Sequence, residues 1–218
     1  MILAAGRGER LKPLTDRIPK PLIEVGGQPL IEHHLQALSR AGVSEVVINI
    51  SWLGEQIRSH LGDGSRWNLS IAYSPEPPGA LETAGGIRRA LPLLDSECFL
   101  VISGDVLTDF DFGYLVGRRP SGLAHLVMVD NPPHHQHGDF NLAPDGALQI
   151  EGMPRLTYSG IGIFHSNLFV DVDPEVPMPL RPLLEQAIGR RQLSGEHYRG
   201  KWMDIGTLER LHVARQLN

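Results

Sequence analysis

A short cationic turn follows the first apolar residues of the chain. The run Leu3-Ala4-Ala5 leads directly into Gly6-Arg7-Gly8-Glu9-Arg10, which holds two glycines and two arginines in five residues. Glycine tolerates positive φ angles and exposes its N–H, and successive N–H groups can bind an anion. Arginine adds a fork of donors that fits phosphate. The turn is therefore predicted to bind phosphate, with an ordinary strand-to-helix turn as the alternative.

A lysine lies between two prolines a few residues later, in the stretch Pro19-Lys20-Pro21. Proline fixes its own φ and holds the residue before it in an extended conformation, so the lysine has a stiff base. Directing this long side chain at a ligand then loses less conformational entropy. The lysine and the cationic turn together favour a functional role over a solvated loop.

Alternating strands and helices are expected to position these residues. Apolar segments predict strands at 1–5, 43–50, 69–73 and 98–106. Helical patterns lie between them at 30–41, 52–64 and 83–94. This order predicts an α/β fold with a doubly wound, mostly parallel sheet that binds its ligand at the carboxyl ends of the strands. The second half has short strands with little helix between them, which predicts an antiparallel or mixed extension.

The composition narrows the classes of function. The chain has 218 residues, of which 41% are hydrophobic, enough for one sizeable core. Its net charge of -5 gives no basic field for nucleic acid, and its one cysteine, Cys98, excludes an internal disulfide. No stretch reaches the roughly 20 apolar residues that cross a bilayer, and the first residues do not resemble a signal peptide. We expect a cytoplasmic protein that binds neither nucleic acid nor membrane, although the short first strand leaves open a natural start upstream of Met1.

The order of several motifs resembles that of the sugar-1-phosphate nucleotidylyltransferases. The stretch LAAGRGERLKPLT, followed by PKPL, resembles the signature of that family. LETAGG at 81–86 resembles its second nucleotide-contacting turn, and SGDV at 103–106 its metal-binding strand end. SGIGI at 159–163 resembles its sugar-side strand, and WMDIGT at 202–207 its second metal position. The likeness covers nearly the whole chain, and the wording of GQPLIEHHL, WLGEQI, HLGDGSRW and LSGEHYRGKWMDIGT favours members that act on N-acetylmuramic acid 1-phosphate.

The resemblance implies a Rossmann-like, GT-A-like nucleotidyltransferase fold in a single domain over residues 1–218. Its nucleotide-binding lobe would span about 1–110, its small antiparallel sugar-binding extension about 120–200, and its C-terminal helix 207–218. The implied reaction is the Mg²⁺-dependent transfer of UMP from UTP to a sugar 1-phosphate, with release of pyrophosphate, in the recycling of peptidoglycan sugars. The oligomeric state is left open.

The functional residues of the family carry over position by position. Arg10, Lys20 and Asp105 are the implied catalytic residues, and Asp105 and Asp204 the implied ligands of Mg²⁺, which prefers carboxylate and phosphate oxygens. The implied nucleotide contacts are Leu3, Ala4, Ala5, Gly6, Arg7, Gly8, Glu9, Arg10, Lys20, Ser74, Leu81, Gly85 and Gly104. The implied sugar contacts are Gly138, Asp139, Glu151 and Gly160. Because a sugar phosphate is already ionised, placed positive charge rather than a general base is expected to drive the reaction.

Several alternatives stay open at this point. Each aspartate could instead cap a following helix, and Glu151 could face solvent, since the Glu-Lys-Pro wording of the family is absent. The histidines at 134, 135 and 137 are interpreted as a polar loop near the sugar, because a zinc site takes about four ligands. His34 is interpreted as a core residue of the first helix. The alternative functions are a mannose-1-phosphate guanylyltransferase-like enzyme and a catalytically silent, nucleotide-binding regulatory subunit.

Overall fold

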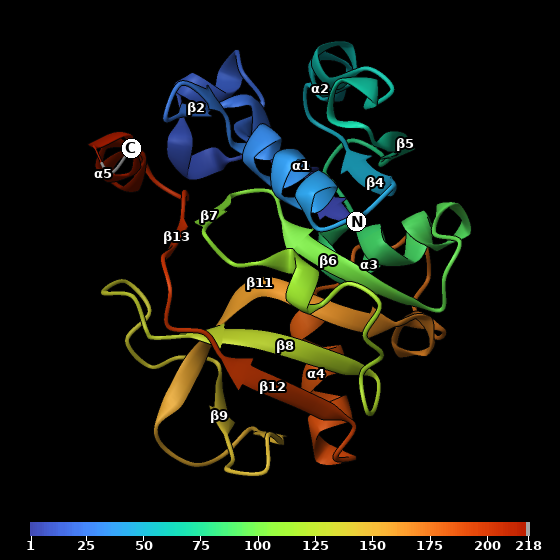
Figure 1. Cartoon of the computed structure of the whole chain (residues 1–218), viewed down its shortest axis with the longest axis vertical. Coiled ribbons are helices and arrows are strands. Elements are labelled where there is room, and N and C mark those ends of the chain that lie inside the picture. The colour runs from blue at the N-terminus through green and yellow to red at the C-terminus, as the bar shows by residue number, and fades with distance from the viewer. Residues whose placement is uncertain (217–218) are drawn as a thin grey trace.

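The computed structural model describes residues 1–216, and its centre is a mixed sheet of nine strands (Figure 1). In order across the sheet lie β10 (Leu148–Gln149), β9 (Phe140–Leu142), β11 (Arg155–His165), β6 (Cys98–Ser103), β1 (Ile2–Leu3), β4 (Glu45–Ile50) and β5 (Ser70–Pro75). Two further strands, β8 (Ala124–Val129) and β12 (Leu193–His197), extend the sheet from β11. The mixed α/β sheet predicted from the sequence is confirmed.

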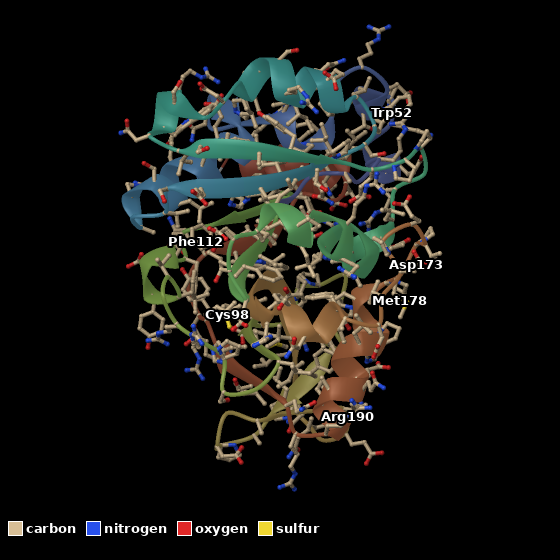
Figure 2. The ribbon with its side chains drawn as sticks, turned by 90° about the vertical axis from the view of Figure 1, so that its right-hand side faces the viewer. Trp52, Cys98, Phe112, Asp173, Met178 and Arg190 are labelled. Carbon is tan, nitrogen blue, oxygen red and sulfur yellow. The ribbon has the colours of Figure 1, made fainter. Side chains whose placement is uncertain are left out.

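The parallel half of the sheet consists of β1, β4, β5 and β6. The strand β4 has the sequence EVVINI, and every residue after Glu45 is buried. Such a continuous buried run is typical of a parallel strand that is covered by helices on both faces. The helices α1 (Leu30–Arg40) and α2 (Gly54–Leu61) pack on one face. The helices α3 (Glu82–Ala90) and α4 (Leu180–Gly189) pack on the other, where Figure 2 shows them between the sheet and the segment that carries Asp173 and Met178.

The strand β11 joins the parallel half to the antiparallel half. It runs antiparallel to β6 on one side and to β8 on the other, with a register shift between Tyr158 and Gly162. The strand β12 lies parallel to β8 and was missed by the sequence analysis. Its residues, LSGEH, are mostly polar and include a glycine, so they lack the pattern of a strand.

The C-terminal helix lies against the segment that follows β1, next to β2 (Figure 1). The helix α5 (Leu208–Gln216) packs on the N-terminal segment through Leu211 against Leu11 and Ile23. A small hairpin, β2 (Glu24–Val25) and β3 (Gln28–Pro29), lies under α5, and Arg215 Nε donates to the backbone oxygen of Glu24 at 3.1 Å. Residues 217 and 218 of the predicted C-terminal helix lie outside the described part.

A second strand pair lies beside the end of β6. The strand β7 (Val106–Thr108) is antiparallel to β13 (Trp202–Asp204), with Asp204 opposite Val106. This pairing brings the segment after β6 next to the segment before α5, although about half the chain separates them. Within residues 1–216, no helix has both the length and the apolar character needed to cross a membrane.

Candidate active site

Two adjoining cavities lie at the carboxyl ends of the parallel strands. The first, of about 380 Å³, is walled by the turn after β1, the Pro-Lys-Pro segment, the end of β4 and the turn before α3. The second, of about 580 Å³, is walled by β11, the start of α4, the loop that carries His134 and His135, and β13. Both cavities are lined by Leu3, Thr83, Ser103 and Asp105, which therefore mark their junction.

The cationic turn borders the first cavity and is fixed from behind by Thr15. Gly8 has a φ of 69°, and a Cβ there would come within 2.9 Å of the Thr15 methyl group, so only glycine fits without strain. Thr15 in turn donates its hydroxyl to the Gly8 carbonyl at 2.9 Å. Gly6 is exposed with open space around it, which leaves the backbone of this turn open to a ligand.

Arg7, one of the two arginines of the turn, is already engaged by the protein. Arg7 donates to the Thr15 carbonyl at 2.7 Å, forms an ion pair with Asp16, and stacks 4.0 Å from the ring centroid of Trp52. Lys12 is likewise ion-paired with Glu9. These contacts compensate the charges of Arg7 and Lys12, so toward the first cavity the turn offers a ligand chiefly its backbone.

Lys20 and Asp105 form an ion pair at the junction of the two cavities. Lys20 Nζ donates to Asp105 Oδ2, and the two side chains are 13% and 33% exposed. The pair links the Pro-Lys-Pro segment to the end of β6, positions 85 residues apart in the sequence. Because Asp105 is followed by β7, the alternative that it caps a helix is wrong.

The second aspartate lies next to the first. The Ile205 N–H donates to the Asp105 carbonyl at 2.7 Å, which places Asp204 beside Asp105. Arg210 of α5 holds Asp204 through two nitrogens: Nη2 lies 2.8 Å from Oδ2, and Nε donates to the backbone oxygen at 3.0 Å. Thr207 Oγ1 accepts from the Arg210 N–H, so Thr207 rather than Asp204 caps α5.

Asp105 and Asp204 are the two carboxylates whose chemistry is compatible with a divalent cation. Asp204 Oδ1 is buried without a hydrogen bond; His134 Nε2 lies 3.0 Å away but is not aligned to donate. The carboxylates of Asp105 and Asp204 both offer hard oxygen donors. Elsewhere too, residues 1–216 contain no cluster of three or more histidine, cysteine or acidic side chains that could hold a metal. A cation here would take two protein carboxylates and complete its shell with phosphate oxygens and water, as Mg²⁺ commonly does.

Arg10 approaches the same aspartate from the N-terminal segment. It is exposed, lines the second cavity, and makes no ion pair within the described residues. A Cβ placed on Gly206 would lie 3.0 Å from both Arg10 Nη2 and Asp204 Oδ2, and would collide with Arg210. Gly206 therefore lets two guanidinium groups reach the Asp204 region.

The far wall of the first cavity is a buried polar network around Glu76 and Asn49, of which sequence reasoning missed Asn49. Asn49 Oδ1 accepts from the Ala4 N–H at 2.8 Å, and Asn49 Nδ2 donates to Glu76 Oε1 at 2.6 Å. Glu76 Oε2 accepts from the Leu81 N–H at 2.7 Å. The network ties the cationic turn to the turn before α3. The available signal was the one polar side chain inside the apolar run VVINI at 46–50.

Several implied nucleotide contacts lie outside the first cavity. Ser74 and Leu81 are buried, 2% and 1% exposed, and do not line it. Gly85 packs against the segment of Figure 2 that carries Met178, with the carbonyl of Val176 only 2.9 Å from where a Cβ would be. The remaining members that line it are Leu3, Ala4, Ala5, Gly6, Arg7, Lys20 and Gly104.

The implied sugar contacts are divided between two places. Asp139 and Gly160 line the second cavity, and Gly138 precedes Asp139. Glu151 does not reach it and lines a separate hollow beside Ile188. The cavity also contains residues that the sequence analysis did not single out: Phe140, Tyr158 and Arg181.

Burial shifts the pKa of two groups near the site. Desolvation raises the pKa of the Tyr158 hydroxyl further above neutral pH. His34 is 2% exposed, and burial lowers its pKa to about 4, with a further contribution from His33. His34 is thus a neutral core residue, as its helical spacing predicted.

The chain is similar in sequence to known proteins over nearly its whole length. The model of the nucleotidyl transferase family matches residues 1–217. The N-acetylmuramate alpha-1-phosphate uridylyltransferase of Neisseria meningitidis serogroup B is 49% identical over 223 residues, covering 100% of this chain and 96% of the relative. The Caulobacter vibrioides protein of the same name is 31% identical, covering 94% and 90%.

A similar fold has been solved. A Bacillus anthracis protein, named as a candidate glucose-1-phosphate thymidylyltransferase and crystallised with sucrose, superposes with a TM-score of 0.86 over 99% of this chain and 93% of its own, at 21% identity. This likeness supports the fold alone. Because the family model covers nearly the whole chain and two relatives exceed 30% identity, the chain belongs to the nucleotidyl transferase family, as its motifs predicted.

Proposed function

We propose that the protein transfers UMP from UTP to N-acetylmuramic acid 1-phosphate, forming the UDP-sugar and pyrophosphate. The observation that carries this proposal is the pair of cavities that meet at Asp105, which is ion-paired with Lys20 of the first cavity. A transfer between two phosphates needs one site for each substrate and positive charge where they meet. The identity of 49% to a uridylyltransferase for N-acetylmuramate 1-phosphate supports the choice of both substrates.

The first cavity would hold the nucleotide. The open backbone at Gly6 lies beside Lys20 in its lining, and the Asn49–Glu76 network shapes its inner wall. The triphosphate would then extend toward the junction, where Lys20 exchanges its contact with Asp105 for a phosphate oxygen. This half corresponds to a nucleotide-binding lobe of about 1–110 within one domain.

The second cavity would hold the sugar phosphate, in the lobe of about 120–200. Its phosphate would lie at the junction, near Arg10, so that an oxygen attacks the α-phosphorus in line while pyrophosphate departs on the opposite side. Both reactants are anions, and Lys20 and Arg10 lower their mutual repulsion in the transition state. The attacking oxygen is already ionised at neutral pH, so the chain needs no general base.

Asp105 and Asp204 are the residues that would hold Mg²⁺. The bound cation would neutralise charge on the phosphate oxygens. Arg210 orients Asp204 for this task through its two contacts at 2.8 and 3.0 Å. We place the reaction in the cytoplasm, in the recycling of peptidoglycan sugars.

A substrate matrix tests the proposal. Pyrophosphate release is measured for the four ribonucleoside triphosphates against the 1-phosphates of N-acetylmuramic acid, N-acetylglucosamine, glucose and mannose, with and without Mg²⁺. We expect the highest kcat/KM with UTP and N-acetylmuramic acid 1-phosphate, and a loss of turnover without a divalent cation. A preference for GTP and mannose 1-phosphate would support the guanylyltransferase alternative, and no turnover in any combination would support the silent subunit.

Variants at the junction complete the test. Lys20→Ala removes a cation that acts on the transferring phosphate, and the expected loss in kcat is about 10²–10³-fold. Lys201→Ala, which removes an exposed lysine outside both cavities, is the matched control. Equal activities of the two variants would contradict the assigned role of Lys20.

A further inference from the structure

One guanidinium group lies in the second cavity with no evident phosphate to bind. Arg181 belongs to the first turn of α4 and lines the second cavity but not the first. Lys20 and Arg10 already supply cations at and beside the junction. A neutral hexose presents hydroxyl groups, which polar side chains and backbone groups satisfy without a net positive charge. An arginine in this position therefore indicates a ligand with a negative group on its sugar ring.

The neighbours of Arg181 hold it in one orientation. Its Nη1 lies 3.2 Å from Asp139 Oδ1, and its Nε donates to Glu185 Oε1 at 2.7 Å. The guanidinium carbon lies 5.6 Å from the ring centroid of Phe140. Within residues 1–216, Nη2 makes no hydrogen bond or ion pair, so part of the donor fork stays available.

Asp139 acts on Arg181 rather than adding a free negative charge. Its Oδ2 accepts from the Tyr158 N–H at 2.8 Å, and its Oδ1 faces both Arg181 and His135 Nε2, the latter at 3.3 Å. Each oxygen of Asp139 thus already has a positive or donor group against it. The carboxylate is in place to orient the guanidinium.

The pair with Glu185 is the contact that a ligand would replace. It joins residues four positions apart on one helix, and the side chains are 51% and 38% exposed. Pairs of this kind add little to stability because water and salt screen them. A carboxylate of a bound sugar, held with two parallel hydrogen bonds, is a stronger partner for the same fork.

We propose that Arg181 binds the carboxylate of the lactyl ether that distinguishes N-acetylmuramic acid from N-acetylglucosamine, and that Asp139 positions it. This inference rests on the function proposed above. It makes Arg181 the residue that selects acidic hexosamine 1-phosphates over neutral ones. Selection of this kind comes from a difference between two affinities, so it is measured as a ratio.

The test compares two substrates in matched variants. With UTP saturating, kcat/KM is measured for the 1-phosphates of N-acetylmuramic acid and N-acetylglucosamine in the parent protein, Arg181→Gln, Arg181→Lys and Arg190→Gln. Arg190, labelled in Figure 2, directly follows α4 and is exposed, so it supplies the control for loss of one positive charge at the other end of this helix. The dissociation constants of the two UDP-sugar products, measured by calorimetry, give a readout that does not depend on turnover.

The expected result is a selective loss. Arg181→Gln should lower kcat/KM for the acidic substrate by about 10–100-fold, as for a lost charged hydrogen bond, and change the value for the neutral substrate by less than about 2-fold. The dissociation constant of UDP-N-acetylmuramic acid should rise by the same factor, while that of UDP-N-acetylglucosamine should stay unchanged. Arg181→Lys keeps the charge but loses the fork of donors, so its kcat/KM for the acidic substrate should lie between those of the parent and Arg181→Gln. Arg190→Gln should have the kcat/KM of the parent for both substrates.

Two outcomes overturn the inference, and they are distinguishable. If the parent turns over N-acetylmuramic acid 1-phosphate but Arg181→Gln loses both substrates equally, or neither, the selective role of Arg181 is wrong and the proposed function stands. If the parent acts only on another sugar phosphate, the proposed function is wrong and the inference falls with it. Circular dichroism and thermal unfolding of each variant show whether it is folded. If Arg181→Gln is not folded, the substrate preference of Arg181→Lys decides whether Arg181 is selective.

Discussion

The guanidinium of Arg210 lies against the carboxylate of Asp204, with Nη2 2.8 Å from Oδ2 and Nε bonded to the backbone oxygen of the same residue. The contact fixes the side chain and the main chain of Asp204 together. It leaves Oδ1 as a buried acceptor without a hydrogen bond. The helix α5 thereby presets the oxygen that a cation would use.

Replacement of Arg210 by glutamine should weaken cation binding. Loss of a residue that orients a metal ligand typically lowers metal affinity by about 10–100-fold. We expect the Mg²⁺ concentration for half-maximal pyrophosphate release to rise by that factor, with part of the activity restored at high Mg²⁺. Binding of Mn²⁺, followed by electron paramagnetic resonance without substrate, should weaken likewise. An unchanged Mn²⁺ affinity would show that Asp204 does not depend on Arg210.

Gly206 should tolerate no side chain. A methyl group there would collide with Arg210 and come within 3.0 Å of Arg10 Nη2, so Gly206→Ala must displace both arginines. We expect it to reduce kcat/KM at least as strongly as Arg210→Gln. Gly189→Ala is the control, because a Cβ at Gly189 meets nothing within 4 Å and alanine favours the helix by about 1 kcal/mol. If both alanine variants kept the parent activity, the close approach of the two arginines to Gly206 would not matter for catalysis.

The Asn49–Glu76 network should contribute measurably to stability. Glu76→Gln replaces one of two acceptor oxygens by a donor, which then faces Asn49 Nδ2 or the Leu81 N–H. A buried donor without an acceptor costs about 1–3 kcal/mol, so the free energy of unfolding should fall by that amount. The KM for UTP should rise as the cavity wall moves. Urea unfolding measures the first effect, and Glu45→Gln, at the exposed start of β4, should change stability by less than about 0.5 kcal/mol.

The predicted residues that line the first cavity include two that come shortly after a strand of the parallel half. Gly6 follows β1 and Asp105 follows β6, and parallel neighbours end at the same edge of the sheet. Strand order and direction therefore bring Gly6 and Asp105 to the same cavity. The contact of Lys20 with Asp105 depends in addition on the path of the Pro-Lys-Pro segment.

The remaining site residues lie where local pattern carries no such information. Arg181 and Arg210 are charged positions of helices, and from the sequence alone they resemble solvated residues. Glu151 was expected near the sugar, but the segment after β10 leads it to a hollow beside α4. Gly85 was expected at the nucleotide, but the chain after β11 covers it. Each of these depends on how distant segments pack, which no local spacing encodes.

Stability should fall with acidity through His34. Burial lowers its pKa to about 4, against about 6.5 in the unfolded chain, so between these values the unfolded state binds more protons. The contribution of neutral His34 to the free energy of unfolding is therefore fully present above pH 6.5 and declines as the pH falls toward 4. We expect the free energy of unfolding to drop by about 2 kcal/mol from pH 7 to pH 5 through this group alone. His34→Leu should remove that part of the slope, whereas His137→Gln, on the exposed loop, should keep it. Urea unfolding at the two pH values measures the difference, and equal slopes in His34→Leu and the parent would contradict the assignment.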